Sequence, residues 1–293
     1  MSKRQKGFMF ILITSLLNGL IPSVTQRAFL TGLSVETILT SRYLLASVLI
    51  WTFIFIAKKK YITDKNTRAY MIMLGILLFT CATVLNESYK YLPGAIIVII
   101  EFTYVVIVVF VEILIGRVGI EKRRVIAMTL AISGLLLVVW PKEGVENLSS
   151  LGILFALLGA FFYAMQTIGM GSLRLEKVDA EVITGYMSLV IFIGNFIRCT
   201  ISAQPYFPSH FNQWILIFVL GAGAAFIAPL LFCMAVKTLG ASDTALGNTT
   251  EPVFAYIAGI LLMNDRISLN ATLGGLFVLG SVVILNMKSR KKL

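Results

Sequence analysis

Ten apolar segments, each about as long as a membrane-crossing α-helix, dominate the sequence. A helix rises 1.5 Å per residue, so about 20 apolar residues cover the hydrocarbon core of a bilayer. The chain is 58% hydrophobic and only 13% charged, whereas soluble domains are about a quarter charged. Short connections between the segments predict one compact all-α bundle that spans the membrane. The expected spans are 8–30, 37–57, 69–89, 93–115, 122–140, 151–173, 181–202, 214–236, 243–263 and 269–287.

The N-terminal stretch resembles a signal peptide, because Lys3, Arg4 and Lys6 precede an apolar run. That run extends from Phe8 to about Leu30, which is too long for the apolar region of a signal peptide. It also has no clear cleavage site of small residues. We therefore interpret it as a retained first span.

The distribution of Lys and Arg predicts the orientation. With the N-terminus inside, 19 of the 25 Lys and Arg residues fall on the inner side of the membrane. They lie in six inner segments, and five of these segments carry two or more cations. Cations concentrate on cytoplasmic loops of membrane proteins. An even number of spans then places both termini in the cytoplasm, in a multi-pass protein of the inner or plasma membrane.

The two halves of the chain resemble each other. The fourth segment opens with KYLPGA (90–95) and the ninth with TLGASD (238–243), and both pairs of segment ends are offset by 148 residues. The second segment of each half also begins similarly, with VETI (35–38) and AEVI (180–183). Since each half has five spans, an odd number, the second half is predicted to lie inverted in the membrane, the plan of many secondary transporters.

The second half carries a more specific resemblance. LGASDTAL (239–246), EPVFA (251–255), GILLMNDR (259–266) and the glycines that follow resemble the second repeat of the EamA family, in the drug/metabolite transporter superfamily. Arg42, within SRYLLA (41–46), matches the arginine that this family tends to carry in its second span. The resemblance covers essentially the whole chain. It implies a metabolite transporter with two EamA-like repeats, residues 1–146 and 147–293.

The first half departs from this pattern. Where the family tends to have proline in the fourth span, the sequence has EFTY (101–104), so Tyr104 is offset by 148 residues from Pro252. An asymmetric site is therefore expected.

The ninth segment contains a candidate site around Glu251 and Pro252. Proline cannot donate a hydrogen bond to the Asn248 carbonyl and weakens the helix there. An ionisable group near mid-membrane is a functional candidate by default. The amide of Asn248 and the Glu251 carboxylate would together hold a polar substrate. Alternatively, Glu251 serves only the packing of neighbouring helices.

The fourth segment supplies Glu101 and Tyr104. Glu101 would bind an ammonium group, carry a coupling proton, or form a structural pair with Arg42 or Arg198. Arg42 in turn would neutralise a substrate carboxylate, Glu101 or Glu251, because a neutral pair is cheaper in hydrocarbon. Glu112, eleven residues beyond Glu101, is interpreted as a structural residue near the inner end.

The first and sixth segments correspond in the two halves, and each carries a polar stripe at helical spacing. Asn18, Pro22 and Gln26 form the first stripe, and Tyr163, Gln166 and Met170 form the second. Such a lining suits a small molecule, which needs a mostly apolar wall with a few polar groups. Small residues at Ala127, Ala131, Ala271 and Gly275 predict close packing of the fifth and tenth segments, within one chain or in a homodimer.

We therefore expect a secondary transporter of a small metabolite that works by alternating access. The resemblance implies amino acids or related compounds, with export favoured weakly. Proton coupling through Glu101 or Glu251 and uncoupled facilitated diffusion both fit the sequence, as does an uptake carrier of a nucleoside-like metabolite. The chain would act as a monomer or homodimer.

Other classes fit the sequence less well. The net charge of +11 comes from short runs between apolar segments, which indicate topology and not nucleic-acid binding. A membrane enzyme acting on lipid-linked substrates is disfavoured, because the single histidine, His210, has no acidic neighbour. A channel is disfavoured by the lack of a charged ring or filter motif. No cofactor, metal or nucleotide-binding motif is evident.

Overall fold

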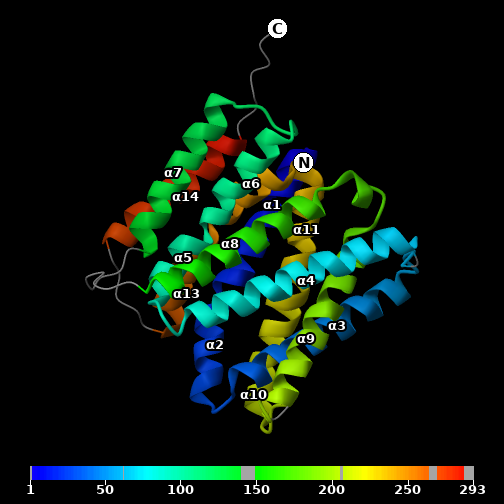
Figure 1. Cartoon of the computed structure of the whole chain (residues 1–293). Coiled ribbons are helices and arrows are strands. Elements are labelled where there is room, and N and C mark those ends of the chain that lie inside the picture. The colour runs from blue at the N-terminus through cyan, green and yellow to red at the C-terminus, as the bar shows by residue number, and fades with distance from the viewer. Residues whose placement is uncertain (1, 62, 140–148, 205–206, 264–268, 287–293) are drawn as a thin grey trace.

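All regular elements of the described residues are helices, and they occupy the ten apolar segments. This computed structural model describes the chain except residues 1, 62, 140–148, 205–206, 264–268 and 287–293 (Figure 1). The first five segments contain α1 (Lys3–Gly19) with α2 (Ile21–Leu30), α3 (Val35–Ile56), α4 (Lys65–Ser88), α5 (Gly94–Glu101) with α6 (Thr103–Leu114), and α7 (Lys122–Val139). The second five contain α8 (Ser150–Met170), α9 (Ala180–Ile201), α10 (Phe211–Phe218) with the π-helix η2 (Val219–Ile227) and α11 (Ala228–Leu239), α12 (Ala241–Asn248) with α13 (Glu251–Met263), and α14 (Leu269–Asn286). A short 3-10 turn, η1 (Leu173–Leu175), precedes α9.

The predicted fold class is confirmed: the protein is an all-α membrane protein with ten spanning helices. By length and hydropathy alone, seven segments of the described chain are able to cross a membrane. The other three are α7, whose first turn carries Lys122, Arg123 and Arg124, the broken pair α12 and α13, and the shorter apolar α14. The predicted repeat boundary at residues 146 and 147 lies outside the described residues and stays a prediction.

Polar side chains fix where two of the helices begin. The Ser34 hydroxyl accepts the Thr37 N–H at the start of α3, at 3.2 Å, and Asp64 accepts the Thr67 N–H at the start of α4, at 3.0 Å. These side chains satisfy backbone donors that have no partner within the helix. Hydrogen bonds from the side chain and backbone of Thr67 lower the pKa of the exposed Asp64 carboxyl.

The fourth and ninth spanning helices, which correspond in the two repeats, are both interrupted at the same place. The fourth breaks at Phe102 and the ninth at Thr249 and Thr250, and Thr250 lies 148 residues after Phe102. Threonine hydroxyls bind carbonyls at the breaks, with Thr103 to Ile100 at 2.6 Å and Thr250 to Gly247 at 2.9 Å. Pro252 predicted the second break, but the first was not expected, because no proline marks it.

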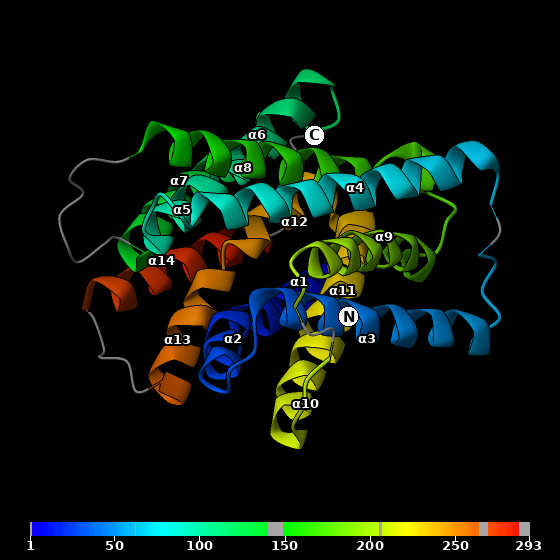
Figure 2. The same ribbon diagram turned by 60° about the horizontal axis from the view of Figure 1, so that its bottom comes forward.

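Packing between the helices follows the internal repeat. The helix α1 packs on α11, and its counterpart α8 packs on α4, the counterpart of α11 (Figures 1 and 2). The pairs α3 with α9 and α7 with α14 each join corresponding helices of the two halves. Each contact thus has a related contact in the other half, as an approximate two-fold arrangement requires. Five spans per half place the second half inverted in the membrane.

The contact between α7 and α14 is a close approach of two backbones. A Cβ atom on Gly134 would lie 2.6 Å from the Gly274 carbonyl oxygen, and one on Gly274 would lie 2.5 Å from the Gly134 carbonyl oxygen. The close packing predicted for the fifth and tenth helices is therefore formed within one chain.

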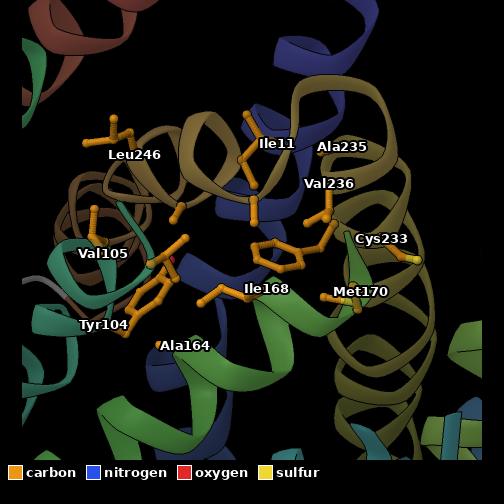
Figure 3. Close-up of a cluster of buried hydrophobic side chains, with 14 of the residues drawn as sticks. Ile11, Tyr104, Val105, Ala164, Ile168, Met170, Cys233, Ala235, Val236 and Leu246 are labelled. Atoms are coloured by element: carbon orange, nitrogen blue, oxygen red, sulfur yellow. The ribbon is translucent and has the colours of Figure 1, made fainter. Parts of the chain in front are cut away.

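One large cluster of buried apolar side chains lies where the two halves meet. In Figure 3, Ile11 of α1, Tyr104 of α6, Ile168 of α8 and Leu246 of α12 contribute to it. Both halves thus share one core, and Tyr104 belongs to this core and to the adjacent cavity.

Candidate functional site

A cavity of about 220 Å³ lies between the halves, beside the breaks in the fourth and ninth helices. We call it the central cavity. Of the nine predicted site residues, eight line it: Asn18, Arg42, Glu101, Tyr104, Tyr163, Gln166, Asn248 and Glu251. The structure therefore brings eight of the nine predicted residues together in one cavity.

Glu251 is held in place by two amides. Its Oε2 atom accepts hydrogen bonds from Asn18 Nδ2 at 3.2 Å and from Asn248 Nδ2 at 3.1 Å. Asn248 Nδ2 also contacts the Tyr104 hydroxyl at 3.2 Å, and its Oδ1 accepts from the Ser15 hydroxyl at 3.3 Å. These contacts join α1, α6 and α12 to the start of α13. Glu251 therefore belongs to a fixed polar network that crosses between the repeats.

Glu101 has different surroundings. No described residue forms a hydrogen bond or an ion pair with its carboxylate, although the residue is partly buried and lines the central cavity. It ends α5, directly before the break at Phe102. An ionisable group without a partner at this depth is costly. The geometry leaves the Glu101 carboxylate available to a molecule in the cavity.

Arg42 was predicted to neutralise a substrate carboxylate, Glu101 or Glu251, and in the described chain no ion pair joins it to either glutamate. Its guanidinium lies 4.8 Å from the centroid of the Tyr43 ring and donates to the Tyr43 hydroxyl at 3.3 Å. The Arg42 Nε atom is buried without a hydrogen-bond partner in the described chain. The guanidinium is thus engaged by the Tyr43 side chain, one residue along α3. Arg42 therefore lines the cavity as a separate positive group.

A row of aromatic rings forms one wall. The ring centroids of Tyr104 and Tyr163 are 4.5 Å apart, and those of Tyr163 and Phe232 are 6.2 Å apart. Phe102, in the break of the fourth helix, lies 5.9 Å from Tyr104. Because aromatic faces are electron-rich, this wall favours apolar groups and cations.

Gln166 is buried among sulfur atoms. It is 1% exposed, and its Nε2 atom lies 3.4 Å from Met170 Sδ and 3.9 Å from Met187 Sδ. Sulfur is a weak acceptor, so the amide retains most of its capacity to donate a hydrogen bond to a ligand.

Gln26 is the one predicted residue that does not line the central cavity. The first helix breaks at Leu20, before Pro22. Residues after the break therefore do not lie on the same helical face as Asn18. Gln26 and Pro22 instead line a second cavity of about 720 Å³, between the ends of α2, α3, α4 and α9. The helical spacing failed here because it assumed one unbroken helix.

Several wall residues were not predicted. Phe102, Phe232, Met187 and Cys81 line the central cavity, but apolar residues in a membrane helix give no sign of whether they face lipid or a cavity. Pro229 and the neighbouring Ala224 and Ala228 carry a usable signal, because Ala224 lies within the glycine-containing η2 and the other two directly follow it. A π-helical stretch often marks a functional site.

A bundle of ten spanning helices in two related halves, with a cavity that carries several polar groups between them, is the architecture of inverted-repeat membrane transporters. A model of the EamA-like transporter family matches residues 5–140 and 150–287. The chain belongs to this family, whose members are transporters and not enzymes. The protein is therefore a multi-pass membrane transporter.

Two further proteins resemble this chain over nearly its whole length. A protein of Clostridium kluyveri described as an uncharacterized transporter is 20% identical, over 98% of this chain and 95% of its own. A crystal structure aligns with a TM-score of 0.78 at 16% identity, covering 98% of this chain and 99% of that chain. The second likeness concerns the fold alone.

Proposed function

We propose that the protein is a secondary transporter that exports a small zwitterionic metabolite, an amino acid or a related compound, by alternating access. One observation carries this proposal. Glu101 and Arg42, of opposite charge, line one cavity, and neither forms an ion pair with any described residue. A zwitterion supplies the two charges that they lack.

The roles follow from charge and surroundings. The Glu101 carboxylate binds the ammonium group, and the Arg42 guanidinium binds the carboxylate of the substrate. The wall formed by Tyr104, Tyr163 and Phe232 contacts the side chain. The volume of about 220 Å³ is below the ~300–1,000 Å³ of sites for drug-sized ligands, which favours a small substrate. Glu251 and Asn248 hold this wall in position through Tyr104.

Ligand binding to the purified protein tests these roles. A ligand that binds the folded state raises its thermal stability. We expect an amino acid to stabilise the protein more than its decarboxylated amine or its deaminated acid. Glu101→Gln should abolish the preference over the deaminated acid, and Arg42→Gln the preference over the amine. Equal stabilisation by all three compounds would contradict the proposal.

Each substitution should weaken binding of the amino acid by roughly tenfold to a hundredfold, because a hydrogen bond to a charged group contributes about 1.5–3 kcal/mol. Glu121→Gln is the matched control, since Glu121 lies on the surface and pairs with Arg123 at 3.3 Å. It should bind every compound as the wild type does.

Proton coupling is proposed through Glu101, because Glu251 already holds two hydrogen bonds. Flux into or out of liposomes should depend on a pH gradient in the wild type and lose this dependence in Glu101→Gln. Loss of the dependence only in Glu251→Gln would assign coupling to Glu251. Flux that never responds to the gradient would indicate an uncoupled facilitator, and selective flux of nucleosides would indicate the alternative substrate.

A further inference from the structure

The central cavity adjoins a larger cavity that lies toward one side of the protein. It shares Ile21 and Arg42 with the cavity of about 720 Å³ at the ends of α2, α3, α4 and α9. Counting spans from the N-terminus, all four of these ends lie on the side opposite the N-terminus. A third pocket of about 340 Å³, lined by Lys59 and Lys237 on the N-terminal side, shares no described lining residue with the central cavity. Among the described residues, the larger cavity that adjoins the central one therefore lies on the side opposite the N-terminus.

The N-terminal side is joined by a buried ion cluster around Asp243. Its Oδ2 atom accepts from an Arg4 Nη atom at 2.9 Å, and its Oδ1 accepts from Arg124 at 3.1 Å. Asp243 is 5% exposed and Arg124 is 9% exposed. Arg4 also donates to the Leu285 carbonyl at 2.7 Å. The cluster thus joins the starts of α1, α7 and α12 to the end of α14.

A second contact on this side joins the two broken helices. The helix α12 begins after Gly240, which has a φ angle of 88° and no side chain that accepts a hydrogen bond. The cap comes from the other half: Glu112 Oε2 accepts the Ser242 N–H at 2.9 Å and the Ser242 hydroxyl at 2.5 Å. A carboxylate is favoured at a helix N-terminus. The other oxygen of Glu112 lies 4.0 Å from Arg117.

The repeat offers no such contact at the other end. Residues offset by 148 from Ser242, Asp243 and Glu112 are Gly94, Ala95 and Ile260. These residue types have no side-chain donor, acceptor or charge. The contacts of Glu112 and Asp243 therefore have no counterpart at the related positions Gly94, Ala95 and Ile260, although the helices of the two halves are otherwise related in pairs.

We propose that Glu112 with Ser242, and Asp243 with Arg4 and Arg124, form a one-sided latch that closes the N-terminal side and makes the opposite-facing state the resting state. The proposal rests on the proposed alternating access. The inverted halves would otherwise make the two states similar in energy, since one state repeats the contacts of the other. The latch removes this equality, and it must open each time the site faces the N-terminal side.

Accessibility of the central cavity tests the latch without a substrate. A reporter cysteine replaces Ala82, which lines the cavity, in a chain whose three native cysteines are changed to alanine. Membrane-impermeant thiol reagents are then added to either side of proteoliposomes of known orientation. In the wild type, labelling should be faster from the side opposite the N-terminus. Glu112→Gln combined with Asp243→Asn should raise the rate from the N-terminal side by about tenfold relative to the other side.

Glu121→Gln is the control for charge removal on the same side, because the Glu121 side chain is 44% exposed and pairs with Arg123 outside the two contacts of the latch. It should leave the ratio of labelling rates unchanged. An unchanged ratio in the folded double variant would overturn the proposal. If no substrate were transported, the proposed function would be contradicted but the latch would not, because labelling of the reporter cysteine does not require transport.

A cross-link provides a second test in case the double variant does not fold. Cysteines replace Glu112 and Ser242, and a short bis-methanethiosulfonate reagent joins them through two disulfide bonds. The cross-linked protein should remain labelled at residue 82 from the side opposite the N-terminus only, and transport should stop until a reductant breaks the link. Transport at the full rate through the cross-linked protein would show that transport does not require the contact between residues 112 and 242 to open. That result would refute the proposed latch.

Discussion

At the scale of single residues, Glu101 and Glu251 show how similar carboxylates of one cavity acquire different roles. Glu251 accepts two amide hydrogen bonds, whereas no described residue is bonded to Glu101. A satisfied buried network rigidifies its surroundings, while an unsatisfied charge favours a partner from outside. We therefore assign positioning to Glu251 and substrate contact to Glu101.

The network around Glu251 predicts an effect on stability. Asn248→Ala removes the contacts to Ser15, Tyr104 and Glu251 and leaves buried polar atoms without partners. We expect the free energy of unfolding to fall by about 1–3 kcal/mol, measured by denaturant titration in detergent micelles. Asn66→Ala, on the exposed first turn of α4, should change it little. Equal stability of both variants would argue against the network.

The sequence predicted the polar residues of the site better than its apolar wall. Glu101, Arg42 and Glu251 were identifiable because charge is rare inside a span. Phe232 and Met187 were not, because burial against lipid and burial against a cavity select the same residue types. The absence of a pair between Arg42 and Glu101 was also beyond the sequence, since the stacking of Arg42 on Tyr43 depends on rotamers.

At the scale of helices, interruptions decide which side chains meet. Pro252 indicated the break in the ninth helix, since proline lacks the N–H that a helix needs, whereas the break of the first helix at Leu20 was not expected. The break at Phe102 had no such signal, because no proline marks it. In the structure Glu101 lines the central cavity, whereas Glu112 caps α12.

The contact between α7 and α14 allows a prediction at this scale. Gly274→Ala places a methyl group 2.5 Å from the Gly134 carbonyl oxygen, so the two helices must separate. Overpacking of this kind costs about 1–3 kcal/mol, measurable as a lower thermal midpoint. Gly280→Ala on the same helix meets only a Leu130 methyl carbon at 3.4 Å and should be nearly neutral. A neutral Gly274→Ala would contradict the close approach.

At the scale of the whole molecule, the number of spans and their pairing were largely predictable. Hydropathy gave the ten helices to within a few residues, and the offset of 148 residues related the fourth helix to the ninth. The sequence did not indicate which side of the cavity is open. That property depends on contacts such as Glu112 with Ser242, which join residues far apart in the chain.

The orientation in the membrane stays a prediction, and labelling tests it. Cysteines at Lys60 and Ser209, both exposed, are introduced singly into the chain whose native cysteines are alanine. With both termini in the cytoplasm, an impermeant reagent outside intact cells should label the Ser209→Cys variant and not the Lys60→Cys variant. Labelling of both from outside would refute the ten-span topology, and the reverse pattern would invert the orientation.

Efflux from proteoliposomes tests the central proposal most directly, namely that a small zwitterion crosses the membrane through the cavity of Glu101 and Arg42. Labelled amino acids and nucleosides are loaded singly, and efflux is compared with that from protein-free liposomes. We predict that at least one amino acid leaves faster, that Glu101→Gln slows it by about tenfold or more, and that Glu121→Gln does not. Folded wild-type protein without flux of any amino acid, or Glu101→Gln at the wild-type rate, would contradict the proposal.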